Sequence, residues 1–263
     1  FTEFDEASFH THPRRYFKMT LSKTVSNQQP VASEPAYRKF HRACLAACII
    51  LAPLVVFLGF AFDPTGGIPP DARGIFADYQ VASPLKIQLF IFFNAITPFF
   101  FPLSFIGLGL LALRRSPWLA TIGMICGLVG SLPFAFFVGP EALGDVMTKT
   151  GNSAAFVAVW NGLSSEGMLV FLQYSWVVGH LLGYVLLGIA LGRARAIPLW
   201  ACSLIVAAIP FQAIAYITNQ GIFQLLSYVL IFIGSIPAAF AMLKGSENDT
   251  FVLGHEGMEG NSQ

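Results

Sequence analysis

Six long apolar stretches separated by shorter polar segments dominate the pattern of this chain. Each stretch could form a helix of about 30 Å or more at ~1.5 Å per residue, which is enough to cross the hydrocarbon core of a bilayer. The sequence therefore predicts an all-α fold, a polytopic transmembrane helical bundle. The six expected spans are residues 43–62, 85–113, 117–138, 168–191, 197–217 and 222–243.

Two of the connecting segments contain patterns of their own. Residues 63–84 are rich in Pro and Gly, and within them the stretch DARGIFADYQ is expected to form a short interfacial helix. Residues 139–167 form the longest expected loop between spans, and it contains the apolar piece 154–163. That piece is too short to span, so we expect it to lie at the interface or to dip into the bilayer as a re-entrant segment.

Polar tails flank the predicted transmembrane domain, residues 43–244. The N-terminal tail, residues 1–42, is rich in Ser, Thr, Gln and Pro and is expected to be disordered, as is typical of such composition. Met19 resembles a natural start, so we expect residues 1–18 not to be native. The C-terminal tail is residues 245–263.

The basic residues indicate an orientation. In a six-span arrangement with both termini on one side, 12 of the 15 Lys and Arg residues lie on the side of the termini. The exceptions are Arg73, Lys86 and Lys149. Because cytoplasmic loops carry an excess of Lys and Arg, the sequence predicts cytoplasmic N- and C-termini in a multi-pass protein of the plasma membrane.

A weak internal similarity relates two pairs of spans. Residues 107–134 and 183–211 both contain an apolar helix end, two arginines, a Pro near a Trp, a second apolar helix and a Pro-Phe pair. One interpretation is a parallel repeat of spans 2–3 and 4–5, as occurs in transporters. The other is that any short cytoplasmic hairpin contains such residues.

Composition excludes several classes of protein. Only 11% of the residues are charged and mean hydropathy is +0.66, whereas soluble domains are about 25% charged. The net charge of +1 argues against a nucleic-acid partner, which would require a basic surface. The four cysteines lie within apolar stretches and form no Cys/His cluster, so no metal site is expected.

The span at 168–191 contains the first candidate for chemistry. It has no Asp, Glu, Lys or Arg, yet His180 lies near its middle, where an ionisable side chain usually has a partner or a function. Gln173 and Tyr184 are 7 and 4 residues away from His180, which places all three on one helix face. We therefore expect this face to point into the bundle, with Gln212 or Tyr228 within reach.

Further polar residues fall in the same outer half of the predicted bundle. Their common depth predicts an outward-facing polar pocket near His180. The alternative is that these side chains only form hydrogen bonds between helices, as buried amides and phenols of membrane proteins often do. The complete candidate set is His180, Gln173, Tyr184, Gln212, Tyr216, Gln224, Tyr228, Asn94 and Gln88.

Motifs for common cofactor and enzyme chemistries are absent from the sequence. Haem bound by two histidines needs a second His within a span, and none is present. A retinal Schiff base needs a Lys inside a span, but Lys86 lies at the very start of its span. No phosphate-binding loop, HExxH or GxSxG motif occurs. No expected span contains Asp or Glu, which argues against a carboxylate proton relay. We therefore expect no cofactor.

Three functions are consistent with these patterns. The favoured one is binding or transport of a small or lipidic molecule in the pocket near His180. The second is a structural or accessory subunit, whose outer helix faces dock a membrane-protein partner or another copy of the chain. The third, an intramembrane enzyme acting on a lipid or isoprenoid substrate through His180 and loop carboxylates, is the least favoured.

Overall fold

The computed structural model describes residues 35–67 and 71–245, which form helices and their connections. Residues 1–34 and 246–263 of the two tails lie outside the described residues, as does the expected start at Met19, whereas residues 36–42 of the N-terminal tail belong to the first helix. Within the described residues the helices are α1 (Ala36–Ala61), α2 (Ala72–Val81), α3 (Pro84–Leu113), α4 (Pro117–Ser131), α5 (Phe134–Lys149), α6 (Ser153–Ser165), α7 (Gly167–Ala194), α8 (Leu199–Thr218) and α9 (Gly221–Lys244).

The all-α prediction and the number of long apolar helices are confirmed. In the described part of the chain, six helical segments are long and apolar enough to cross a membrane, counting α4 and α5 as one. Large apolar side chains such as Phe99 and Phe171 are 71% and 63% exposed on their outer faces, as expected of a surface that contacts lipid. The cytoplasmic termini and the parallel repeat stay predictions.

The prediction that residues 139–167 form a loop is wrong, because most of these residues are helical. Pro133, which has no amide hydrogen, separates α4 from α5, and α5 then continues to Lys149. The ion pair between Lys149 and Asp145, with 2.6 Å between Nζ and Oδ2, supports its last turn. The helical segment that includes the third expected span thus continues beyond residue 138 and includes Glu141 and Asp145.

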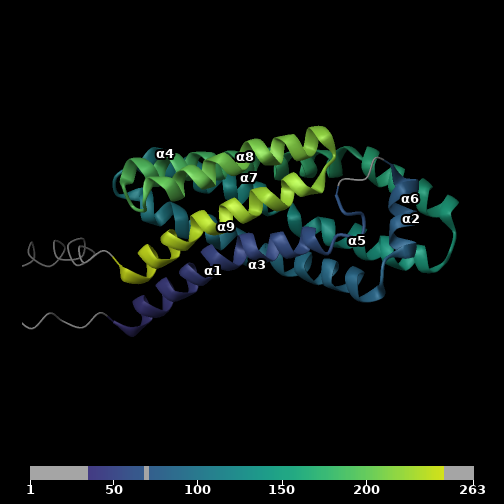
Figure 1. Cartoon of the computed structure of the whole chain (residues 1–263), viewed down its shortest axis with the longest axis horizontal. Coiled ribbons are helices and arrows are strands. Elements are labelled where there is room, and N and C mark those ends of the chain that lie inside the picture. The colour runs from purple at the N-terminus through teal and green to yellow at the C-terminus, as the bar shows by residue number, and fades with distance from the viewer. Residues whose placement is uncertain (1–34, 68–70, 246–263) are drawn as a thin grey trace, which may run out of the picture. The chain divides into compact units, whose positions relative to one another are not determined.

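Glycines allow α4 and α7 to pack with their backbones in contact. A Cβ atom on Gly130 would lie 2.7 Å from the Cα of Gly179, and one on Gly183 would lie 2.7 Å from the Cα of Gly127. The glycines of the two helices thus form small-residue faces that meet each other. The other long helices lie alongside in the same bundle (Figure 1), with α1 next to α3 and α9, and α8 next to α7 and α9.

Helices α2 and α6, which we call the cap, lie at one end of the bundle beside α5 (Figure 1). The cap has its own hydrophobic cluster, separate from the main core, in which Phe76 and Phe156 pack with ring centroids 5.3 Å apart. The predicted interfacial helix corresponds to α2. The apolar piece 154–163 lies within α6, which packs against α2 and α5.

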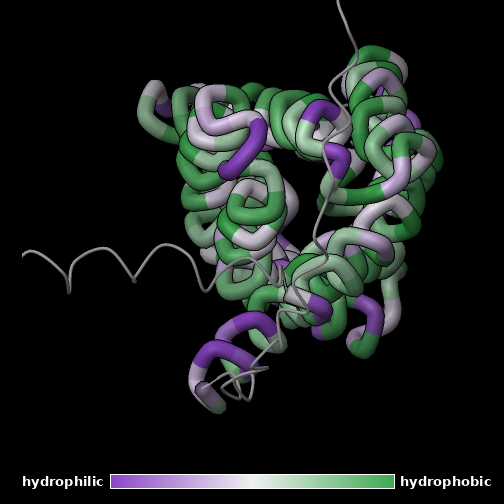
Figure 2. Tube along the Cα trace, turned by 90° about the vertical axis from the view of Figure 1, so that its left-hand side faces the viewer, coloured by the Kyte–Doolittle hydropathy of each residue, from purple (hydrophilic) through white to green (hydrophobic). Residues whose placement is uncertain are grey.

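The two ends of the bundle differ in charge. The six acidic residues in the described part of the chain are all at the cap end, which we call the acidic end. The opposite end, which we call the basic end, contains the start of α1 and the end of α9. Figure 2 views the bundle from this end, and most residues along its helices are hydrophobic. The basic end carries Arg38, Lys39, Arg42, Arg114, Arg115, Arg193, Arg195 and Lys244, and the acidic end carries Asp63, Asp71, Asp78, Glu141, Asp145 and Glu166.

Candidate functional site

His180 is fully buried at the centre of a polar cluster between helices. Its imidazole stacks on the Trp176 ring one turn earlier in α7, with centroids 4.0 Å apart and planes inclined by 21°. Its Nδ1 forms a hydrogen bond with the Trp176 carbonyl oxygen. Its Nε2 lies 2.9 Å from the side-chain amide of Gln212 in α8, so the expected contact between these two residues is present.

The hydrogen-bond partners determine which nitrogen of His180 carries the proton. A fully buried imidazole without an acidic partner is neutral, because an isolated buried charge is costly. Since a carbonyl oxygen only accepts, Nδ1 is the donor and Nε2 must accept. Gln212 must therefore present its NH₂ group to Nε2, which a half-turn of the amide allows because its oxygen and nitrogen occupy equivalent positions.

The same half-turn provides a partner for Tyr228. With the Gln212 oxygen facing His180, both the Gln212 nitrogen and the Tyr228 hydroxyl are buried without a hydrogen bond. After the turn the oxygen faces the Tyr228 hydroxyl, which lies against the Gln212 side chain and can donate to it. In this orientation Tyr228, Gln212, His180 and the Trp176 carbonyl can form one chain of hydrogen bonds.

Two more of the predicted residues border this chain. Tyr216, in α8, lies against the side chains of Gln224 in α9 and Trp176 in α7. Tyr184 is fully buried one turn beyond His180, and its hydroxyl lies near Ser104 of α3 without a hydrogen bond. Apart from Gln173, the predicted polar residues of α7, α8 and α9 thus meet in the interior, where they join helices.

The remaining predicted residues lie elsewhere. Asn94 is buried on α3 and donates to Glu141 of α5, with 3.0 Å between Nδ2 and Oε2. Gln88 is exposed near the start of α3. Gln173 shares a helix face with His180, but it lies in the second turn of α7, where it is exposed rather than directed into the bundle interior.

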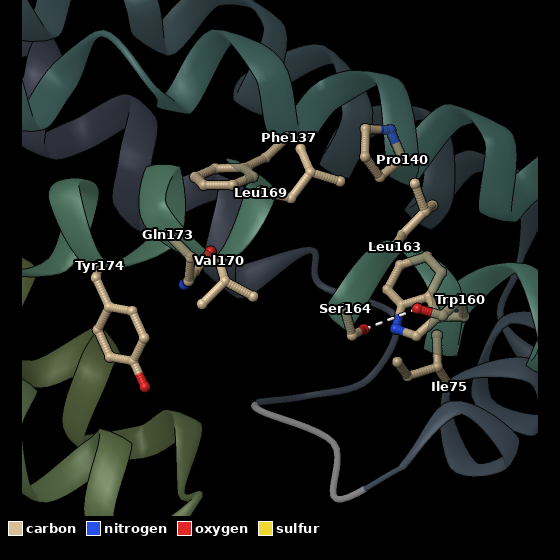
Figure 3. A pocket seen from close by; sticks show the side chains of 10 residues that line it. All are labelled: Ile75, Phe137, Pro140, Trp160, Leu163, Ser164, Leu169, Val170, Gln173 and Tyr174. Carbon is tan, nitrogen blue, oxygen red and sulfur yellow. Dashed lines mark hydrogen bonds between the residues drawn. The ribbon is translucent and has the colours of Figure 1, made fainter. Parts of the chain in front are cut away.

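Gln173 instead lines a cavity between the start of α7 and the cap, which we call the cap cavity (Figure 3). Its volume is about 510 Å³, and His180 is not among the lining residues. Figure 3 shows Gln173 and Val170 on one side, Ser164 and Trp160 on the other, and an open space between them. The walls are Ile75 of α2, Phe137 and Pro140 of α5, Trp160, Leu163 and Ser164 of α6, and Leu169, Val170, Gln173 and Tyr174 of α7.

The acidic end has a negative electrostatic character outside the spans. Burial raises the pKa of the Asp63 carboxyl above its ordinary value, although Thr65 donates to it from both its backbone nitrogen (2.9 Å) and its hydroxyl (2.8 Å). Burial also raises the pKa of Tyr79 in the cap, and the nearby Glu141, Asp63 and Asp145 add to this shift. None of these acids lines the cap cavity.

Comparison of the chain with protein-family models, with curated proteins and with solved structures finds no match. The candidate sites therefore depend on their own geometry alone.

Proposed function

We propose that this integral membrane protein binds an amphiphilic, lipid-like small molecule in the cap cavity. The observation that carries the proposal is the cavity itself, about 510 Å³ between the first two turns of α7 and the cap. Ligand pockets for small molecules have volumes of about 300–1,000 Å³, with mostly apolar walls and a few polar groups. The cap cavity has this composition.

The position of the polar groups supports a molecule with a chain and a head. Phe137, Leu163 and Leu169 offer apolar surface to a chain. The amide of Gln173 can both donate and accept hydrogen bonds to a head group. The Ser164 hydroxyl already donates to the Trp160 carbonyl, with 2.8 Å between the oxygens, and so remains able to accept.

The surrounding charges favour an uncharged head group. Of the charged residues in the described part of the chain, the acidic end has six acids and only three bases, Arg73, Lys86 and Lys149. None of the residues that line the cavity is charged, so the lining offers no cation to an anionic head group, whereas Gln173 can form hydrogen bonds with hydroxyl groups. We therefore infer that a monoacylglycerol-like molecule binds better than a fatty acid of the same chain length.

The polar cluster around His180 supports binding rather than passage through the bundle. His180 and Tyr184 are at most 1% exposed, and Phe101 packs against both rings. A transported molecule would need these side chains to move apart. The pocket that we propose therefore lies about two turns of α7 away from His180, at Gln173.

Fluorescence of Trp160 provides the test. The full chain is purified in detergent and titrated with monoacylglycerol that carries two bromine atoms in its acyl chain, which quench tryptophan on contact. We expect saturable quenching that is lost in Trp160→Phe, because the other tryptophans, Trp118, Trp176 and Trp200, do not line the cavity. Brominated stearate should require a higher concentration for the same quenching.

Two substitutions on α7 provide a matched pair. Val170→Phe fills the cap cavity and should abolish saturable quenching. Val178→Phe makes the same change two turns later, on a side chain that is 52% exposed and remote from the cavity, and should leave quenching intact. Equal quenching in both variants, or quenching that persists in Trp160→Phe, would overturn the proposal.

A further inference from the structure

A second cavity lies at the opposite end of the protein, in a groove between α1 and α9. Its volume is about 520 Å³, and every side chain that lines it is apolar. Ala43 and Ala47 form one wall, on α1, and Ile236, Phe240 and Leu243 form the other, on α9. The groove does not overlap the cap cavity or the cluster around His180.

Small residues on α1 create this groove. Ala43 and Ala47 are spaced by one helical turn and are exposed, whereas Phe240 and Leu243 extend outward from α9 and are 60% and 49% exposed. The unequal size of the side chains on the two helices leaves a channel along the bundle surface. A flexible acyl chain can fill a channel of this kind more completely than a rigid helix can.

Cationic side chains stand at the mouth of the groove. Lys39 precedes Ala43 by four residues and Lys244 follows Phe240 by four, so each lysine is on the same helix face as the groove wall next to it. Both lysines are exposed. Arg42 reaches across from α1 to the end of α9, where its guanidinium lies against Gly245.

Of the acidic residues in the described part of the chain, none lies at this mouth. Every acidic residue within residues 35–67 and 71–245 is at the other end of the bundle. The apolar wall alone would not select a lipid, because acyl chains are as apolar as the groove. Any selectivity must therefore come from the head group and the cations.

We propose that an anionic phospholipid occupies this groove, with one acyl chain between α1 and α9 and its phosphate bound by Lys39 and Lys244. Basic pockets between transmembrane helices bind anionic head groups in this way. A second copy of the chain is a poorer occupant, because it would bring a second set of the same cations to the interface. If the basic end is cytoplasmic, as the sequence predicts, the groove opens to the anionic leaflet.

Native mass spectrometry of the full chain in detergent tests this proposal. The protein is titrated with equal amounts of dioleoyl phosphatidylglycerol and dioleoyl phosphatidylcholine, and the bound ratio is measured. The wild type should retain phosphatidylglycerol in preference. Because a basic residue near the membrane surface contributes about fivefold in affinity, Lys39→Gln with Lys244→Gln should reduce the preference about 30-fold.

Two control variants separate head-group binding from general charge effects. Arg73→Gln with Lys86→Gln removes the same charge at the acidic end and should leave the preference unchanged. Ala43→Leu with Ala47→Leu fills the groove without changing charge, at two exposed positions, and should reduce phosphatidylglycerol binding.

Four outcomes would overturn the proposal. One is equal binding of the two lipids by the wild type. Another is an equal loss of preference in both double charge variants, which would indicate nonspecific attraction. The third is a dimer that disappears when the alanines of the groove are enlarged, which would assign the groove to a second copy of the chain. Competition by soluble glycerol phosphate would indicate that the acyl chain is not needed, which also contradicts it.

Discussion

Replacing His180 and Gln212 by leucine, singly and together, tests the hydrogen-bond chain in the core. His180→Leu leaves the Gln212 NH₂ group buried without an acceptor, and Gln212→Leu leaves both His180 Nε2 and the Tyr228 hydroxyl without partners. An unsatisfied buried polar group costs about 1–3 kcal/mol, so each single variant should lose at least about 1 kcal/mol of unfolding free energy, and Gln212→Leu should lose more. The double variant removes both His180 and Gln212. Its loss of unfolding free energy should therefore be smaller than the sum of the two single losses.

The expected coupling energy is about 0.6 kcal/mol and at most about 1.7, the range measured for side-chain hydrogen bonds within membrane proteins. The assay is unfolding in mixed micelles with increasing sodium dodecyl sulfate, followed by circular dichroism. Tyr184→Phe is the control, because it removes a buried hydroxyl that has no hydrogen bond and should be neutral or stabilising. If the loss in the double variant equals the sum of the two single losses within about 0.3 kcal/mol, the contact between His180 and Gln212 does not stabilise the fold.

Three further substitutions test other parts of the fold by the same unfolding assay. Gly130→Ala should cost about 1–3 kcal/mol because the new methyl meets the α7 backbone, whereas Gly139→Ala has open space around it; equal effects would contradict the backbone contact. Asp63→Asn should stabilise the protein at pH 7. Because burial raises the pKa of Asp63, the folded wild type loses stability as pH rises above about 4. The stability gained by the substitution should therefore vanish below that pH, and a gain independent of pH would contradict this. Asn94→Leu should cost about 1–3 kcal/mol and increase hydrogen exchange in α5, because Glu141 loses its donor; unchanged exchange would count against this link.

The fold was predictable from sequence because membrane spans are long and nearly free of charge. The exception was the segment after Pro133, where Glu141 and Asp145 interrupt the apolar pattern. Those acids indicate a loop if every helix is assumed to end at the membrane surface. In the structure α5 continues to meet α2 and α6, and its acids have partners of their own: Asn94 of α3 for Glu141 and Lys149 for Asp145.

The candidate site was predictable only in part, for a similar reason. Helical spacing correctly placed Tyr184 beside His180 in the interior, and depth correctly matched His180 with Gln212. The same spacing misplaced Gln173, because a shared face leads into the bundle only where other helices surround it, and the second turn of α7 faces the cap instead. Trp160, on the other wall of the cap cavity, belonged to a piece whose position the sequence left open.

Photo-crosslinking measures most directly whether the cap cavity is the binding site. The full chain in detergent is irradiated with a monoacylglycerol that carries a diazirine in its acyl chain, and adducts are located by mass spectrometry. If the cap cavity is the binding site, adducts form on residues 160–174, excess unlabelled monoacylglycerol removes them, and Val170→Phe prevents them. Adducts confined to the outer faces of the spans, unaffected by competitor or by Val170→Phe, would contradict this assignment.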